Sequence, residues 1–255
     1  MVVGLDRFQT FFADYADRYT LIGGAACDLL FTDANLPFRV TKDLDIVLCV
    51  EVIDAEFGAR FKEFLDAAGY QRWAMAEGER KFYRFEQPSD SAFPAMIELF
   101  ARPPAELALP DDARYVRLSV EDEIVSLSAL LLHADYYDAL LANRREQGGV
   151  TILTEDMLIP FKARAFLDLT ERKAQGEAVD SKNITKHRND IFRLLQLMPE
   201  TRRVSVAQSL KEDLRGFTVA MAAETFEPGD FKVAITKEDG VSLLRAIYEL
   251  ETEGR

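Results

Sequence analysis

Two aspartates, Asp43 and Asp45, stand at alternate positions at the start of an apolar run, residues 43–50. In a strand, residues two apart share a face, so both carboxylates would point one way while Leu44 and Ile46 point into a core. Two carboxylates about 4 Å apart near a protein surface repel by about 4 kcal/mol. Such a pair either extends into water or holds a cation.

Glu98 interrupts the otherwise apolar run 95–100, which is predicted to be a strand. An acid in a buried strand is costly unless it is paired, protonated or coordinated. The alternative is an edge strand with Glu98 on its wet face, but Met96 and Phe100 would share that face. Three carboxylates on neighbouring strands would suit a hard divalent cation such as Mg²⁺, which takes oxygen ligands together with substrate phosphates.

A pair of glycines, Gly23 and Gly24, follows the apolar residues Leu21 and Ile22 and precedes an apolar helix predicted over 24–31. A helix N-terminus presents backbone N–H groups and a positive dipole, and glycine lets a phosphate approach the backbone closely. A plain turn is the other interpretation, because the pair matches neither a Walker loop nor a dinucleotide fingerprint.

Two lysines in the second half of the chain are further candidates. Lys162 lies at the centre of the apolar stripe of a helix predicted over 161–173, so it must either reach the edge of the stripe or meet an anion. Lys186 and Asp190 share the polar face of a helix predicted over 183–198. They form either an ordinary surface ion pair or part of an anion site.

In chain order these residues resemble the nucleotidyltransferase superfamily, whose signature is a Gly-Gly or Gly-Ser turn, an Asp-x-Asp strand and a third acid on a later strand. The run Arg39-Val-Thr41-Lys-Asp43-Leu-Asp45 is similar to one found in abortive-infection (AbiEii-like) nucleotidyltransferase toxins of type IV toxin–antitoxin systems. Those toxins also follow the catalytic half with a lysine-bearing helical region and a further Lys/Asp helix, which Lys162 and 186–190 resemble.

The resemblance implies transfer of NMP from an NTP to a hydroxyl acceptor with two Mg²⁺ ions, or Mn²⁺ in their place. It assigns Asp43 and Asp45 as ligands of both metals. Glu98 would complete the acceptor-side metal and help to deprotonate the attacking hydroxyl. The residues that would bind the nucleotide are Gly23, Gly24, Arg39, Thr41, Lys162, Lys186 and Asp190.

The acceptor stays open at this point between RNA, such as tRNA, and a small molecule of the kind that antibiotic-modifying transferases use. The formal charge of −13 weakens the RNA hypothesis, although 162–193 holds eight basic and five acidic residues. A non-catalytic binding module of the same fold is a third interpretation. The toxin-like reading adds a cognate antitoxin as a protein partner.

The pattern of apolar runs predicts an α+β fold: a nucleotidyltransferase-like mixed β-sheet with flanking helices, followed by a C-terminal helical bundle. Residues 1–119 are expected to form the catalytic domain and 120–255 a helical domain that completes the active-site cleft. In the first, the predicted helices are 8–19, 24–31 and 57–68, and the predicted strands are 43–50, 72–76, 81–86, 95–100 and 114–118. In the second, the predicted helices are 121–132 (extended toward 143), 161–173, 183–198, 204–215 and 238–250, with Pro160 in a first helical turn.

The two cysteines, Cys27 and Cys49, stand among apolar neighbours and predict reduced core thiols rather than a disulfide or a metal site. No signal peptide and no apolar run of membrane-spanning length is recognisable. A cytoplasmic protein with no membrane partner is therefore expected.

Overall fold

The computed structural model describes residues 2–39, 41, 43–48, 55–76, 81–101, 115–117 and 133–250. The chain divides into two compact units. The first comprises Met1–Ile124 and Leu141–Thr154, and the second comprises Val125–Leu140 and Glu155–Arg255. The predicted helix 121–132 lies outside the described residues.

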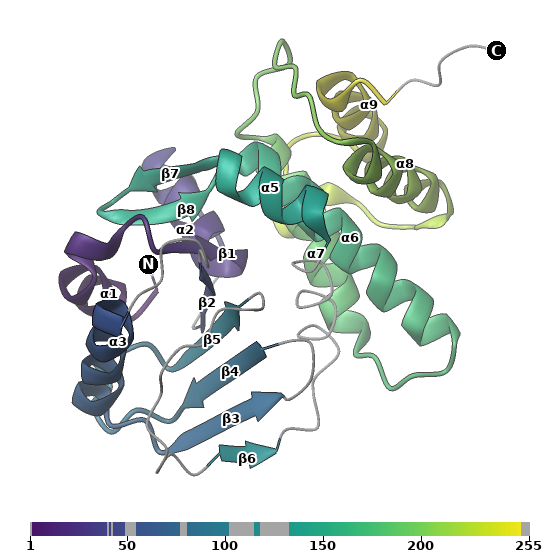
Figure 1. The fold of residues 1–255 in the computed structure, drawn as a ribbon. Coiled ribbons are helices and arrows are strands. Elements are labelled where there is room, and N and C mark those ends of the chain that lie inside the picture. The colour runs from purple at the N-terminus through teal and green to yellow at the C-terminus, as the bar shows by residue number, and fades with distance from the viewer. Residues whose placement is uncertain are drawn as a thin grey trace. The chain divides into compact units, whose positions relative to one another are not determined.

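The first unit contains an eight-stranded mixed sheet in the order β6-β3-β4-β5-β2-β1-β8-β7 (Figure 1). Its parallel pairs are β1–β8, β2–β5 and β3–β6, and the other neighbours are antiparallel. A mixed sheet with helices, followed by a helical bundle, confirms the predicted α+β class. The strands are β1 (Tyr19–Ile22), β2 (Asp43–Leu48), β3 (Arg72–Ala76), β4 (Lys81–Glu86), β5 (Met96–Ala101), β6 (Tyr115–Arg117), β7 (Arg144–Gln147) and β8 (Val150–Leu153).

Three of these strands were not predicted. β1 takes the end of the predicted helix 8–19, which is instead α1 (Leu5–Phe11) followed by a short 3₁₀ turn, η1 (Ala13–Tyr15). β7 and β8 form an antiparallel hairpin through Gly148 and Gly149, both at positive φ. β7 is polar and partly exposed, so it carries no apolar alternation, and β8 is short and buried at all four positions.

One face of the sheet carries the apolar core of this unit. Residues that alternate along β2 and β5, namely Leu44, Ile46, Ile97 and Leu99, are fully buried. Against this face pack α1 and α3 (Ala55–Ala68), which lie side by side in Figure 1. Rings of α1, of α3 and of Phe12, which follows α1, pack in edge-on or tilted contacts with one another and with strand rings; these aromatic residues are Phe8, Phe12, Phe57, Phe61 and Phe64 with Tyr19 and Phe85.

The second unit is helical. Its helices are α6 (Glu155–Ala174), α7 (Ser181–Leu195), α8 (Gln208–Ala223) and α9 (Lys237–Tyr248), with a 3₁₀ turn η2 (Pro228–Phe231), and α5 (Ala134–Ala142) contributes its residues up to Leu140. α6 packs against α7 and α8, and α8 packs against α9. The break between α6 and α7 falls at Gly176, at φ 90°, as the polar run there predicted.

Pro160 lies inside α6 rather than in a first helical turn, because the helix begins at Glu155, earlier than predicted. A proline lacks the N–H that would donate to the carbonyl four residues back, here that of Asp156. The Tyr248 hydroxyl supplies that hydrogen bond instead, donating to the Asp156 carbonyl at 2.6 Å. A residue at the end of α9 therefore satisfies the carbonyl that the proline leaves without its helical donor.

Replacing Tyr248→Phe should lower the free energy of unfolding by about 1–3 kcal/mol, because the buried Asp156 carbonyl loses its donor. Urea unfolding followed by circular dichroism measures the loss. In a Pro160→Ala background, the alanine N–H can donate to the same carbonyl. Tyr248→Phe should then lower the free energy of unfolding by only about a few tenths of a kcal/mol. An equal cost in both backgrounds would contradict this pairing of Pro160 with Tyr248.

Candidate functional site

A row of paired residues crosses neighbouring strands on the face of the sheet opposite the aromatic core. Ile22 of β1 pairs with Asp45 of β2, Asp45 pairs with Glu98 of β5, and Glu98 pairs with Arg84 of β4. Residues directly opposite one another across strands point to the same face and have adjacent Cβ atoms. Asp43 stands two residues before Asp45 on that face and pairs in register with Met96. The fold thus brings all three predicted acids to one face.

The two predicted glycines lie at the same place, where β1 passes directly into α2 (Gly23–Asp33). Gly23 has φ 62°, and a Cβ added there would overlap Oδ2 of Asp45. Ile22 at the N-cap has no polar side chain to cap the helix. The Asp45 carboxylate therefore lies against the N-terminus of α2, where the positive end of the helix dipole favours an anion.

Two further predicted residues, Arg39 and Thr41, lie next to Gly24. A Cβ added at Gly24 would come within 2.6 Å of Oγ1 of Thr41 and 3.4 Å of Nη2 of Arg39. Arg39 also stacks its guanidinium over the Phe38 ring at 5.2 Å. A hydroxyl, a guanidinium and a helix N-terminus are the groups that bind phosphate oxygens in proteins.

Arg84 is a site residue that the sequence analysis missed. Its Nε and Nη2 both donate to Oε1 of Glu98, at 3.0 and 2.5 Å, and the two side chains are only 5% and 12% exposed. The signal was present, because Arg84 interrupts the aromatic run Phe82–Phe85 as Glu98 interrupts its own strand. Glu98 is thus a paired acid, one of the outcomes that its apolar strand allowed.

The electrostatic state of Glu98 follows from its neighbours. Burial raises the pKa of the Glu98 carboxyl well above its ordinary value, and the adjacent Asp45 carboxylate raises that pKa further. The Arg84 guanidinium acts in the opposite direction and does not cancel the rise. Negative charge is therefore costly in this row, and a cation bound there would relieve the cost.

Within the part of the chain that the structure describes, no three His, Cys, Asp or Glu side chains are grouped closely enough to hold a metal ion by themselves. Mg²⁺, however, is commonly held by one or two carboxylates together with substrate phosphates. The alternate aspartates Asp43 and Asp45 fit that smaller ligand set, and the anion-binding end of α2 lies beside Asp45. The donor chemistry suits a cation that arrives with a phosphate-bearing substrate.

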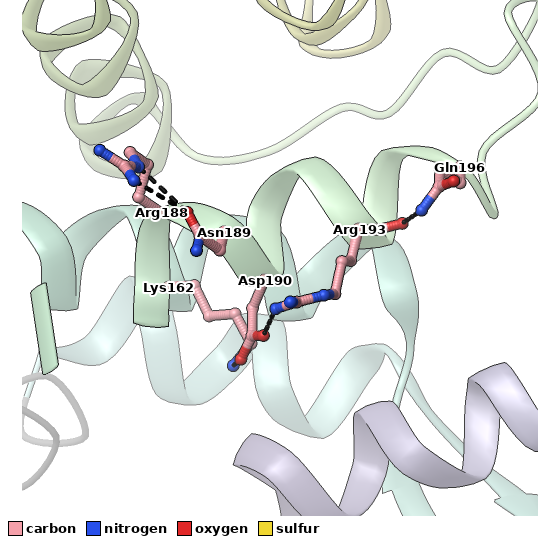
Figure 2. A network of polar contacts seen from close by, with 6 residues as sticks. All are labelled: Lys162, Arg188, Asn189, Asp190, Arg193 and Gln196. Atoms are coloured by element: carbon pink, nitrogen blue, oxygen red, sulfur yellow. Dashed lines mark hydrogen bonds and ion pairs between the residues drawn. The ribbon is translucent and has the colours of Figure 1, made fainter. Parts of the chain in front are cut away.

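In the helical unit, Lys162 and Asp190 form an ion pair with each other. Nζ of Lys162 lies 2.9 Å from Oδ2 of Asp190, and Nη1 of Arg193 lies 3.0 Å from Oδ1 (Figure 2). Lys162 and Asp190 are almost fully buried, at 5% and 0% side-chain exposure. Lys162 thus meets an anion on α7 instead of reaching the edge of its apolar stripe.

The basic stretch 162–193 is largely engaged in ion pairs within the helical unit. Arg188 binds Glu224 at 2.9 Å and stacks over the Phe226 ring at 4.0 Å. Besides the Asp190 cluster, the pairs are Arg164–Asp213 at 3.1 Å and Arg172–Glu177 at 2.7 Å. Lys186 lies half-buried on α7 one turn before Asp190. Most of the positive charge that the sequence suggested for RNA is therefore neutralised inside the unit.

The remaining predictions from composition concern cysteine and membranes. Cys27 is buried and free of a disulfide, and Cys49 lies outside the described residues. Across the ranges that the structure describes, no helix combines the length and apolar character that a membrane crossing requires.

No family model and no curated protein matches the sequence. Among solved structures, the chain is similar to an antigenic nucleotidyltransferase-like protein from Paracoccidioides brasiliensis, with 16% identity, a TM-score of 0.42 and coverage of 97% of this chain and 96% of that one. It is also similar to the antibiotic-resistance factor ANT(2'')-Ia, with 14% identity, a TM-score of 0.38 and coverage of 86% and 92%. These TM-scores do not assign a family to the chain.

Gly23→Ala should destabilise the first unit, because alanine at φ 62° is strained by about 1–2 kcal/mol and its Cβ would displace the Asp45 carboxylate as well. Gly176→Ala is the matched control: its φ is 90°, and an added Cβ meets nothing within 4 Å. Thermal unfolding of both variants should show the larger loss for Gly23→Ala. Equal losses would mean that Asp45 is not held against α2.

Lys162→Met should cost about 3 kcal/mol of unfolding free energy, because it leaves the buried Asp190 carboxylate with one fewer cation. Lys186 is half-buried on α7, and Lys186→Met should lower the free energy of unfolding by less than about 1 kcal/mol. Denaturant unfolding of the two variants checks the difference. A stable Lys162→Met protein would show that the Asp190 pair contributes nothing to the helical unit.

Proposed function

We propose that the chain is a metal-dependent nucleotidyltransferase that transfers NMP from an NTP to a hydroxyl acceptor. The observation that supports this most directly is the contact of the Asp45 carboxylate with Gly23 at the N-terminus of α2. The contact brings the Asp45 carboxylate, the proposed cation ligand, next to a helix N-terminus, the proposed phosphate-binding group. The register that sets Glu98 beside Asp45 adds the third acid of the proposed reaction.

In the proposed reaction the acceptor oxygen attacks the α-phosphorus of the NTP. A bond forms from that oxygen to phosphorus, the bond to the bridging oxygen of the β-phosphate breaks, and pyrophosphate leaves with the electron pair. Glu98 takes the proton of the attacking hydroxyl. Mg²⁺ ions, when bound at Asp43, Asp45 and Glu98, would neutralise the charge that develops on the attacking and departing oxygens.

The nucleotide-binding roles belong to the same proposal. Gly23 and Gly24 would offer backbone N–H groups to the triphosphate, with Arg39 and Thr41 beside Gly24. Lys162, Arg193 and Asp190 together carry a charge of +1, so the cluster retains the capacity to attract an anion. Lys186 would add a further charge for the phosphates. Its substitution by Met should weaken NTP binding without unfolding the protein.

Two classes of acceptor are compatible with this chemistry. RNA, including tRNA, is the acceptor that the toxin-like reading implies. A cationic small molecule is favoured by the overall charge of −13 and by the ion pairs that occupy the basic stretch 162–193. The two differ in where a transferred label ends up.

The transfer assay uses each NTP labelled at the α-phosphate, Mg²⁺ or Mn²⁺, and either total RNA or a panel of hydroxyl and amine compounds. Label on RNA supports the first acceptor and label on a compound supports the second. Asp45→Ala should reduce transfer below detection, because it removes a carboxylate. The protein should stay folded, because the smaller alanine side chain introduces no steric clash. Glu86 of β4 lies on the same face as Arg84, and Glu86→Gln is the control variant, which should remain active.

A protein that transfers label to no acceptor and shows no Mg²⁺-dependent nucleotide binding would instead be a non-catalytic module. An active Asp45→Ala variant would show that the carboxylates are not the metal ligands. The toxin role, with its cognate antitoxin, has a separate test. Expression of the native chain, but not of Asp45→Ala, should arrest bacterial growth, and co-expression of the antitoxin should restore it.

A further inference from the structure

The connection between α2 and β2 turns back along α2 as soon as the helix ends. Asn35 has φ 55°, in the left-handed region, and the Leu36 N–H donates to the Phe31 carbonyl at 2.8 Å. Helices commonly end in this way, with a left-handed residue and a returning N–H that satisfies one of the last carbonyls. The turn brings Phe38 and Arg39 back beside the helix that precedes them.

Two aromatic rings lie along this return path. Phe31 is buried in the core at 1% exposure, and the half-buried Phe38 ring packs on it with the ring centroids 5.1 Å apart. The Arg39 guanidinium lies over the Phe38 ring, with its Cζ 5.2 Å from the centroid. A guanidinium within about 6 Å of an aromatic centroid is attracted to the ring. The core thus supports Phe38, and Phe38 in turn holds the guanidinium.

The ring contact also sets where the guanidinium lies. Gly24 and Phe31 are about two turns apart on one side of α2. Phe38 meets the helix at Phe31, whereas Nη2 of Arg39 lies 3.4 Å from a Cβ added at Gly24. Arg39 therefore reaches along the helix toward its N-terminus. A long side chain outside helix and strand has many rotamers, and ordering it when a ligand binds lowers the affinity.

We propose that Phe38 is a positioning residue for the triphosphate: its ring, packed on Phe31, holds the Arg39 guanidinium at the N-terminus of α2 before the nucleotide binds. The inference rests on the proposed function, in which Arg39 binds phosphate oxygens beside Gly24. An arginine that is already in place presents its planar set of donors to a phosphate with less loss of side-chain freedom. Phe38 acts on binding only through Arg39.

The test is a double-mutant cycle on the full chain, with the affinity for inorganic triphosphate in the presence of Mg²⁺ measured by isothermal titration calorimetry. Phe38→Leu removes the aromatic face and keeps an apolar side chain, so it should weaken binding about fivefold. Arg39→Gln should weaken binding by about tenfold or more, because a charged donor to phosphate is lost. In the Arg39→Gln background, Phe38→Leu should have no further effect. An equal loss in both backgrounds would overturn the inference.

Matched variants separate the aromatic ring from the shape of the connection. Phe38→Tyr keeps the ring and should retain native affinity, and a loss equal to that of Phe38→Leu would contradict the inference. Leu36 is 39% exposed in the same connection, and Leu36→Ala keeps its backbone hydrogen bond, so the affinity should not change. Circular dichroism establishes that each variant is folded. If Phe38→Leu does not fold, Phe38→Met takes its place in the cycle.

The Arg39→Gln variant distinguishes this inference from the proposed function. If Arg39→Gln binds triphosphate as the native chain does, the assignment of Arg39 to the nucleotide fails, and the role of Phe38 fails with it. A native chain without affinity for triphosphate would overturn the proposed function as a whole. If Arg39→Gln loses affinity and Phe38→Leu does not, the positioning role of Phe38 alone is wrong.

Discussion

The parallel pairing of β2 with β5 decides where the acidic side chains of this protein lie. It sets Asp45 beside Glu98 on one face and Leu44, Ile46, Ile97 and Leu99 on the other. A slip of one residue would exchange the faces, turning the aspartates into the aromatic core and the apolar residues out of it. Full burial of one aliphatic side chain is favourable by about 2 kcal/mol, so four outweigh a repulsion of about 4 kcal/mol between neighbouring carboxylates. The apolar face therefore holds the acids together against their own repulsion.

Both units contain a buried carboxylate that is neutralised by a cation from a neighbouring element. Glu98 is paired by Arg84 from the next strand, and Asp190 on α7 is paired by Lys162 from α6 and by Arg193. The net charge around the two carboxylates differs in sign. The row in the sheet keeps an excess of negative charge, whereas the cluster in the helical unit keeps an excess of positive charge.

The sequence predicted the elements whose signals are local. β3 and β4 match their predicted ranges, and α3 ends at Ala68, where Gly69 follows at φ 63°, as expected. Two of the strands that were not predicted were missed for different reasons. β8 pairs with β1, which is far away along the sequence, and β7 has no apolar face of its own. The start of α6 was missed because Pro160 looked like a first-turn residue. Its tolerance inside the helix comes from Tyr248, far along the chain.

The candidate site shows the same division. Residue type and spacing were enough to select Gly23, Asp45 and Glu98, because glycine before a helix and acids in apolar strands are locally anomalous. The pairing of Glu98 with Arg84 was not predicted, because which strand lies beside β5 is a property of topology and not of either run. The same holds for Lys162, whose partner Asp190 belongs to the next helix. Anomalous charges are visible in the sequence, while their neutralising partners appear only in the fold.

Asp45 links the two halves of the proposed chemistry through one constraint. Its carboxylate already lies at the N-terminus of α2, in the position that an anion would favour. A triphosphate approaching the same helix end would therefore meet a like charge unless a cation lay between them. On the proposed function, nucleotide and cation cannot bind independently: each supplies charge that the other needs.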